Sequence, residues 1–271
     1  MLHLLQLEWL KMYKNTFFRV MVILYAVLLP GFFLVGKSVL PAEAQAGVPI
    51  SQSTIYGFPD VFNYLGYLGN WMVFFFLGFV AITSVAGEFS NRTLRQNIIT
   101  GLSRTDYFLS KLLFVLAVSG VAALYYGLIA LLLGFTHTDP LYASAVWKNI
   151  DAIPRYFLMC VGYMSFGLLL AVVIRRMAIV LFLYLAYGLF IEPLLRYVVH
   201  GNIIQHESIH WYPLNAFEDL APNPIAEMAD EFSREMGFSF WLSPTVAVLL
   251  SMAYLLLFLY LSWRSLRYSD L

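Results

Sequence analysis

Two histidines around a glutamate, in the order His206, Glu207 and His210, are the residues whose spacing most directly suggests chemistry. When the pattern His-Glu-x-x-His lies on a helix, it places two imidazoles on one face. There they can bind zinc beside a glutamate that acts as a base. The chemistry would be hydrolysis, so a zinc metalloprotease is one function that this pattern suggests.

A catalytic zinc site of this kind needs a third protein ligand, and no well-supported ligand follows in the sequence. Pro213 and Ala216 stand where one common extension of the pattern has a glycine and a histidine. Asp230 or Glu231 is available farther along, in a stretch without other metal-binding features. We therefore expect no catalytic zinc site, and His206 and His210 are weak metal candidates only.

A second pattern, from Gly31 to Ser38, has the glycine, lysine and serine spacing of a phosphate-binding loop. That chemistry requires a strand, a turn that exposes backbone N–H groups and a following helix. Here the pattern ends a long apolar run and is followed by Pro41, so Lys37 is better placed to reach lipid headgroups. We expect no cofactor on this chain, so any use of ATP requires a partner subunit.

The composition of the chain shows what surrounds these residues. Of 271 residues, 61% are hydrophobic and 12% are charged, the mean hydropathy is +0.75 and the formal net charge is zero. A soluble domain has about 25% charged residues, and a fold of this size has too little interior for so much apolar surface. The composition excludes a soluble enzyme, a disordered chain and a nucleic-acid binder that relies on basic charge. Because Cys160 is the single cysteine, it also excludes a disulfide scaffold.

Six continuous apolar runs are long enough for membrane-spanning helices, which need about 20 residues each. They cover residues 17–36, 61–87, 112–135, 156–174, 178–197 and 240–262. None shows the two-residue alternation of barrel strands. The first run is longer than the core of a typical signal peptide, so we expect it to remain a span. The sequence therefore predicts one all-α membrane domain over residues 1–271, with six transmembrane helices.

The basic residues are distributed unequally between the two sides of this bundle. An even number of spans puts both termini on one side, and that side carries 11 of the 16 Lys and Arg residues. They are Lys11, Lys14, Arg19, Arg92, Arg95, Arg104, Lys111, Arg175, Arg176, Arg264 and Arg267. Of the 16 acids, 12 lie on the other side, many of them in an acidic outer loop over residues 198–239. The positive-inside rule therefore places both termini in the cytoplasm.

Residues 1–16 have the spacing of a moderately amphipathic helix. Apolar side chains share one face, and they are Leu2, Leu5, Trp9 and Met12. Such a helix can lie in the interface between lipid headgroups and acyl chains. The alternative is that it extends the first span into the cytoplasm.

Two further patterns concern packing inside the membrane. The third span carries a stripe of small residues, namely Gly120, Ala123, Gly127, Ala130 and Gly134. Such a stripe lets another helix approach closely. We expect packing within this chain, and a dimer contact or a transport path is the alternative. Near the outer end of the fifth span, Glu192 and Arg196 are expected to form an interfacial ion pair beside Pro193.

The polar segment 88–104, between the second and third spans, is the most informative stretch. Ser-Asn at 90–91 can cap a short helix, and Gly101 can end it. Leu94 and Ile98 are four residues apart and form a small apolar ridge. Residues 103–106, Ser-Arg-Thr-Asp, match a capping box that starts the next helix. The sequence predicts a helix of two to three turns that lies parallel to the membrane and faces the cytosol.

This segment resembles the type-2 permease family of ABC transporters, the ABC-2 membrane-spanning subunits. The resemblance rests on Glu88, the run Thr93-Leu94-Arg95-Gln96, the pair Ser103-Arg104 and Lys111. The predicted topology, with six spans and an N-terminal interfacial helix, is similar to that of the family over the whole chain. The chain departs from the family pattern at Arg92, where members often have glycine. It also departs at residues 101–102, where members often have a proline before the Ser-Arg pair.

The resemblance implies the permease half of an ABC transporter in a bacterial inner membrane. Two permease chains, identical or different, would pair. Each would receive a cytoplasmic ATPase subunit that carries ATP and Mg²⁺. The helix after Glu88 would be the coupling helix, and Arg175-Arg176 would form a second contact. The implied ATPase contacts are Glu88, Asn91, Arg92, Thr93, Leu94, Arg95, Gln96, Ile98, Ser103, Arg104, Arg175 and Arg176. Export is the usual direction in the family.

Two other functions stay open at the level of sequence. One is a membrane-embedded zinc metalloprotease that uses His206 and His210, and the other is a non-transporting membrane anchor that recruits an ATPase. The transported substrate cannot be read from the chain. The aromatic residues of the second span suit an amphiphilic cargo, but aromatic residues in spans usually serve packing.

Overall fold

The computed structural model describes residues 2–39, 52–91, 93–99, 101–139, 142–204, 206–221 and 242–268. Arg92, residues 222–239 of the acidic loop and the distant metal candidates Asp230 and Glu231 lie outside the described residues. Within the described ranges, every regular element is a helix and no strand occurs. The all-α fold class predicted from the sequence is therefore confirmed.

Six helical segments of the described chain are long and apolar enough to cross a membrane, as predicted. We number them span one to span six, and they run over Thr16–Lys37, Val61–Ser90, Arg104–His137, Ala143–Ile174, Met177–Ile204 and Pro244–Arg267. Several helices extend beyond the apolar runs, because apolar length decides what crosses the bilayer and capping decides where a helix begins or ends. Span three, for example, begins directly after Ser103, well before Leu112.

The spans are assembled from the following helices. Span one is α2 (Thr16–Val39), and span two consists of α4 (Val61–Met72), the π-helical turn η1 (Val73–Leu77) and α5 (Gly78–Ser90). Span three is α7 (Arg104–His137), and span four contains α8 (Ala143–Trp147) and α9 (Ala152–Ile174). Span five joins α10 (Met177–Ala186) to the π-helical segments η2 (Tyr187–Ile191) and η3 (Leu194–Ile204), and span six is α13 (Pro244–Arg267). The short helices are α1 (Leu2–Lys14), α3 (Gln52–Tyr56), α6 (Thr93–Ile99), η4 (Glu207–His210) and α11 (Pro213–Glu218).

The central helix of the bundle is α9, which packs against α5, α7 and α13. At Gly167 a Cβ atom would lie 3.1 Å from the carbonyl oxygen of Gly78, so glycine lets α9 and α5 approach closely. Spans two and four have the largest share of buried residues, whereas few residues of spans one, five and six are buried. Exposed apolar helices suit a protein that is surrounded by lipid, because lipid tails are as apolar as leucine.

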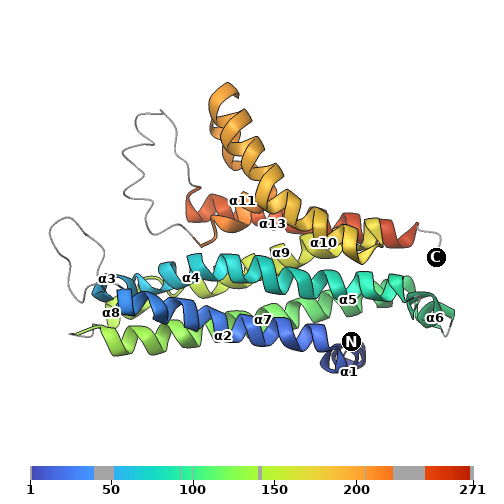
Figure 1. The fold of residues 1–271 in the computed structure, drawn as a ribbon, viewed down its shortest axis with the longest axis horizontal. Helices are drawn as coiled ribbons and strands as arrows, with labels where there is room; N and C mark the ends of the chain where they lie inside the picture. The colour runs from blue at the N-terminus through green and yellow to red at the C-terminus, as the bar shows by residue number, and fades with distance from the viewer. Residues whose placement is uncertain are drawn as a thin grey trace.

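Both chain termini lie at one end of the bundle, together with α1 and α6, as Figure 1 shows. The short helices α3 and α8 lie at the opposite end. This is the arrangement that an even number of spans requires. Span five differs from its neighbours: after α10 its orange continuation turns away from the bundle in Figure 1. The turn follows the π-helical segment η2 and Pro193, and both features interrupt regular helical hydrogen bonding.

The phosphate-loop pattern at residues 31–38 lies inside α2. Its backbone N–H groups are therefore part of a helix and not of a turn that could hold phosphate. Lys37 Nζ lies 2.8 Å from Nε2 of His137 in α7, so this lysine joins spans one and three.

Candidate functional site

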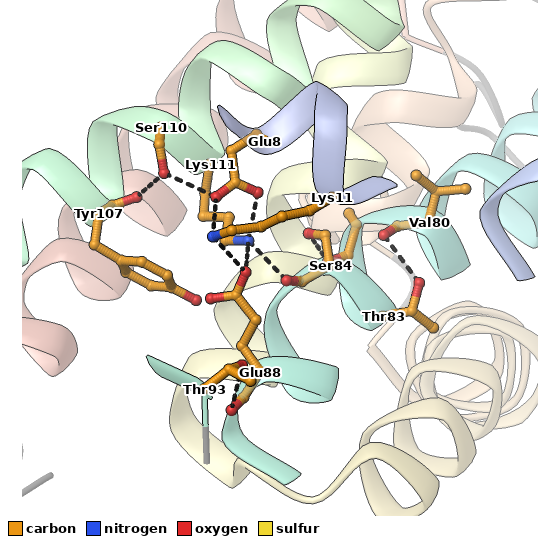
Figure 2. A network of polar contacts seen from close by, with 11 residues as sticks. Glu8, Lys11, Val80, Thr83, Ser84, Glu88, Thr93, Tyr107, Ser110 and Lys111 are labelled. Carbon is orange, nitrogen blue, oxygen red and sulfur yellow. Dashed lines mark hydrogen bonds and ion pairs between the residues drawn. The ribbon is translucent and has the colours of Figure 1, made fainter. Parts of the chain in front are cut away.

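Charged side chains from three separate helices meet in one group, as Figure 2 shows. One of these helices is α1, which lies at the end of the bundle that carries the termini (Figure 1). Lys111 of α7 lies at the centre of the group. Its Nζ is 2.7 Å from Oε2 of Glu8 in α1 and 2.8 Å from Oε1 of Glu88 in α5. It also donates to the carbonyl oxygen of Ser84 at 2.8 Å. These contacts use all three donors of the ammonium group.

Lys11 of α1 adds a second cation at the edge of this group. Its Nζ lies 3.3 Å from Oε1 of Glu8 and 3.4 Å from Oε1 of Glu88. Lys111 and Glu8 are 1% and 2% exposed, whereas Lys11 is 41% exposed. We call Glu8, Lys11, Glu88 and Lys111 the polar cluster. Its two acids and two bases balance, which is the condition under which charges can be buried at moderate cost.

The polar cluster changes the ionisation of its members in α1. Burial opposes the ionisation of Glu8, but the ammonium groups of Lys111 and Lys11 outweigh burial and lower the pKa of this carboxyl group. Burial also opposes the charged form of Lys11, yet the carboxylates of Glu88 and Glu8 raise the pKa of its ammonium group. Both groups are therefore ionised at neutral pH, and their attraction is in place there.

The polar cluster holds α1, the end of span two and the beginning of span three together. Glu88, which the sequence assigns to the ATPase contact, has its carboxylate committed to two lysines. α6 begins shortly after it, and Thr93 Oγ1 donates to the carbonyl oxygen of Glu88 at 3.4 Å. Figure 2 shows this link between the cluster and α6. The cluster therefore positions the short helix that connects spans two and three.

The helix α6 is present between spans two and three, but its faces differ from the prediction. The predicted ridge requires an exposed Leu94, whereas Leu94 is 1% exposed and belongs to the core. Ile99 is 75% exposed, and Gln96 is also exposed. The side chains of Arg95 and Ile98 lie outside the described part of the chain. A seven-residue helix has too few apolar residues to show which side faces inward, so packing against α5 decides it.

The boundaries of α6 follow partly from the predicted signals. Ser90 belongs to α5 and Asn91 is the C-cap of α5, so neither begins α6 as the sequence suggests. Gly101 has a φ of 105°, a backbone conformation that favours glycine. The N-cap half of the predicted capping box is confirmed, because Oγ of Ser103 accepts from the backbone N–H of Asp106 at 3.0 Å. Ser103 Oγ also donates to Oδ2 of Asp106 at 2.6 Å.

Arg104, assigned from the sequence to the ATPase contact, binds the end of span six. Its Nη1 donates to the carbonyl oxygen of Leu266 at 3.2 Å and to that of Arg267 at 2.7 Å. The last carbonyl groups of a helix have no partner within the helix, so a guanidinium group stabilises them. Arg104 therefore joins the beginning of span three to the end of span six.

The second turn at this end, Arg175-Arg176, lies close to the end of span two. Arg175 is the left-handed C-cap of α9, with a φ of 61°. Its guanidinium carbon lies 5.5 Å from the ring centroid of Phe89 in α5, a cation–π distance. Arg176 is exposed. The structure thus brings Arg175 beside the residue that follows Glu88, as a two-part docking surface would require.

The small-residue stripe of span three packs within this chain over most of its length. A Cβ atom on Gly127 would meet Ile153 of α9 at 2.9 Å, and one on Gly134 would overlap the ring of Phe58. The two alanines of the stripe are buried. Gly120 is different, because a Cβ there would meet no atom within 4 Å.

The histidine pair does not form the arrangement that zinc hydrolysis requires. His206 is exposed and precedes η4, a 3-10 helix, where its Nδ1 accepts from the backbone N–H of Ser208 at 3.1 Å. Ser208 Oγ also lies 3.0 Å from Nε2 of His200. His210 is buried at 4% exposure. Among the residues that the structure describes, no three His, Cys, Asp or Glu side chains are grouped to hold a metal.

Glu192 has a role that sequence reasoning missed. Its carboxylate accepts from the backbone N–H groups of Leu214 at 3.1 Å and Asn215 at 2.6 Å, at the start of α11. Glu192 and Arg196 are both buried, at 4% and 3% exposure. The ion pairs of the described residues do not include Glu192 with Arg196, so the predicted interfacial pair is wrong. The carboxylate of Glu192 instead holds α11 against span five through its hydrogen bonds. No local signal identifies a backbone partner more than 20 residues away in the sequence.

Comparison with known proteins adds one finding to this geometry. A family model described as "ABC-2 family transporter protein" matches residues 4–207. The match includes α1, the polar cluster, α6 and spans one to five. No curated protein matches the chain significantly.

Proposed function

Because this chain belongs to the ABC-2 family of transporter proteins, we propose that it is a permease subunit to which a separate ATPase subunit docks at α6. The family assignment supports a membrane-embedded transport subunit. The observation that carries the docking site is the position of α6 at the termini end of the bundle, directly joined to the polar cluster. Ile99, 75% exposed, is the apolar anchor that α6 offers a partner.

The proposed mechanism is mechanical coupling from the ATPase to the spans. ATP and Mg²⁺ bind to the partner, because the phosphate-loop pattern of this chain lies within a helix. A force on α6 reaches span two through Thr93 and Glu88. From Glu88 it passes to α1 and span three through Lys111. Rigid elements joined by a buried network can transmit such a displacement as a unit.

The turn at Arg175-Arg176 is the second docking contact in this proposal. Its proximity to Phe89 supports a continuous surface formed by α6 and this turn. The other residues assigned to the contact fall into two groups. Exposed residues such as Gln96 and Arg176 would touch the partner. Glu88, Leu94, Ser103 and Arg104 instead position the surface through their internal contacts.

We further propose that two permease chains pair, that both termini are cytoplasmic and that the transporter exports its cargo from a bacterial cytoplasm. The exposed apolar faces of spans one, five and six support pairing, because they offer large surfaces to a second chain. The excess of basic residues at the termini end supports a cytoplasmic placement. Export is the usual direction in this family.

Of the two rival functions, the structure argues against one and leaves the other to experiment. A membrane-embedded zinc metalloprotease would require His206 and His210 to face one metal, yet one is exposed and the other is buried. A membrane anchor that recruits an ATPase without transport would share the α6 surface. Reconstituted ATP hydrolysis distinguishes a transporter from such an anchor. Cargo stimulates hydrolysis in a transporter and has no effect in an anchor.

The docking proposal is tested by purifying the tagged chain from its native membrane and measuring ATP hydrolysis in the purified sample. We expect the wild type to carry ATPase activity and Ile99→Asp to lose it by about tenfold or more, because loss of an apolar anchor costs about 1.5–3 kcal/mol. Ile203→Asp is the matched control, since Ile203 is equally exposed at 75% but lies in span five. Full ATPase recovery with Ile99→Asp would contradict the docking site.

A further inference from the structure

An apolar groove runs along the outside of the bundle at the termini end, between α1, α2 and α7. One lobe, of about 700 Å³ counting its open side, is lined by Phe18 and Tyr25 of α2 and Val121 of α7. A second lobe, of about 780 Å³ counting its open side, lies under α1 beside Leu5. The two lobes share Trp9 and Ala117. The groove thus has two lobes that meet at Trp9 and Ala117.

The depth of the groove places it in one leaflet of the bilayer. Its wall on α2 extends from Phe18 to Ala26, and eight residues of helix rise about 12 Å. This is less than half of a hydrocarbon core that is about 30 Å thick. Trp9 is half exposed at the level of the polar cluster, and tryptophan favours the boundary between headgroups and acyl chains. The groove therefore begins at that boundary and ends within the same leaflet.

Two cations are close in the chain to the residues that line the groove. Lys14 ends α1 and Arg19 follows Phe18 in α2, and both side chains are exposed. The ion pairs among the described residues include neither of them. Arg19 donates to the hydroxyl of Thr16 at 3.3 Å. Their positive charge is available to an anionic group at the membrane surface.

From these observations we propose that the groove binds one anionic phospholipid of the leaflet on the termini side. One acyl chain lies in each lobe on either side of Trp9, and the phosphate group faces Lys14 and Arg19. A two-lobed, predominantly apolar groove matches two acyl chains, and the two cations match an acidic headgroup. The site goes beyond the docking of an ATPase. A lipid there would brace α1, which carries two members of the polar cluster.

The test is native mass spectrometry of the purified chain, without ATPase, in detergent with added phosphatidylglycerol or phosphatidylcholine of the same acyl chains. We expect the wild type to retain phosphatidylglycerol about fivefold or more over phosphatidylcholine. The double variant Lys14→Gln/Arg19→Gln should retain both lipids equally. Arg264→Gln, an exposed cation in the last turn of α13, is the control and should behave as wild type.

A second variant tests the lobes. Ala117→Phe fills the point where the lobes meet and should reduce the retention of both lipids, whereas Ala178→Phe, on an exposed position of α10, should not. Equal retention of the two lipids by the wild type would show a nonspecific apolar surface and overturn the proposal. Unchanged lipid retention in Ala117→Phe would also overturn the proposal. The same holds if Ala117→Phe changes the oligomeric state of the chain and leaves its lipid retention as in the wild type. Because no ATPase is present, these outcomes do not depend on the docking proposal.

Discussion

Lys111 and Glu8 are 103 residues apart in the sequence, and yet only 2.7 Å separates their charged atoms. The sequence pattern identified Glu88 and Lys111 as notable positions, and it predicted the Ser103 cap from a spacing of three residues. Both signals are local. The sequence around Glu8 gives no sign of its role, because no local pattern reveals a partner in a distant helix. Long-range ion pairs therefore came only from the structure.

The polar cluster makes a prediction about stability. Lys111→Met should destabilise the protein by about 3–5 kcal/mol, because it leaves the buried carboxylate of Glu8 without its main partner. The double variant Glu8→Gln/Lys111→Met should recover a large part of this loss. Thermal unfolding in detergent of the two single variants and the double variant measures the coupling. Arg264→Met, at an exposed position, is the control. Strictly additive effects would show that the pair does not stabilise the protein.

At the scale of elements, the spans were predictable and the short helices were only partly so. Long apolar runs identify spans because the bilayer sets their length. The presence of α6 followed from its flanking signals, but the inward position of Leu94 did not. A single buried leucine does not define a helical periodicity of apolar residues. α11 had no periodic signal at all. Glu192 of span five holds its beginning, and Asp219, its own C-cap residue, joins its end to the backbone N–H of Leu242.

Asp219 makes the attachment of α11 dependent on pH. Its Oδ2 accepts from the backbone N–H of Leu242 and from the side chain of Asn215, both at 3.1 Å. Burial raises the pKa of Asp219 from 3.8 to about 7, although Arg196 and the Leu242 N–H oppose this. Because the folded state holds this proton more tightly than the unfolded state, the contribution to stability is present at low pH and is lost as the pH rises toward 7.

We therefore expect the melting temperature of the wild type to fall between about pH 5 and about pH 8. The fall should exceed that of Asp219→Asn by on the order of 5–10 °C. The asparagine keeps an oxygen acceptor for Leu242 and cannot ionise, so it is the matched variant. Melting curves of the two proteins across this range provide the measurement. Parallel pH profiles would contradict the assignment of the titration to Asp219.

At the scale of the whole molecule, the zero net charge combines a basic end and an acidic end. The basic end holds the polar cluster, α6 and both termini, and it is the end where we propose that the ATPase docks. The number of spans and this division of charge were predictable, because both follow from composition along the chain. The central position of α9 and the outward turn of span five were not, because they depend on packing between distant helices.

The central claim, that an ATPase docks on α6 at the basic end, is tested most directly by crosslinking from a defined position. A photoreactive amino acid replaces Ile99 in one variant and Ile203, equally exposed in span five, in the other. Each variant is irradiated in its native membrane, and the crosslinked protein is identified by mass spectrometry. The account predicts that position 99 crosslinks to an ATP-hydrolysing subunit and that position 203 does not. An ATPase crosslinked from position 203, or none from position 99, would contradict it.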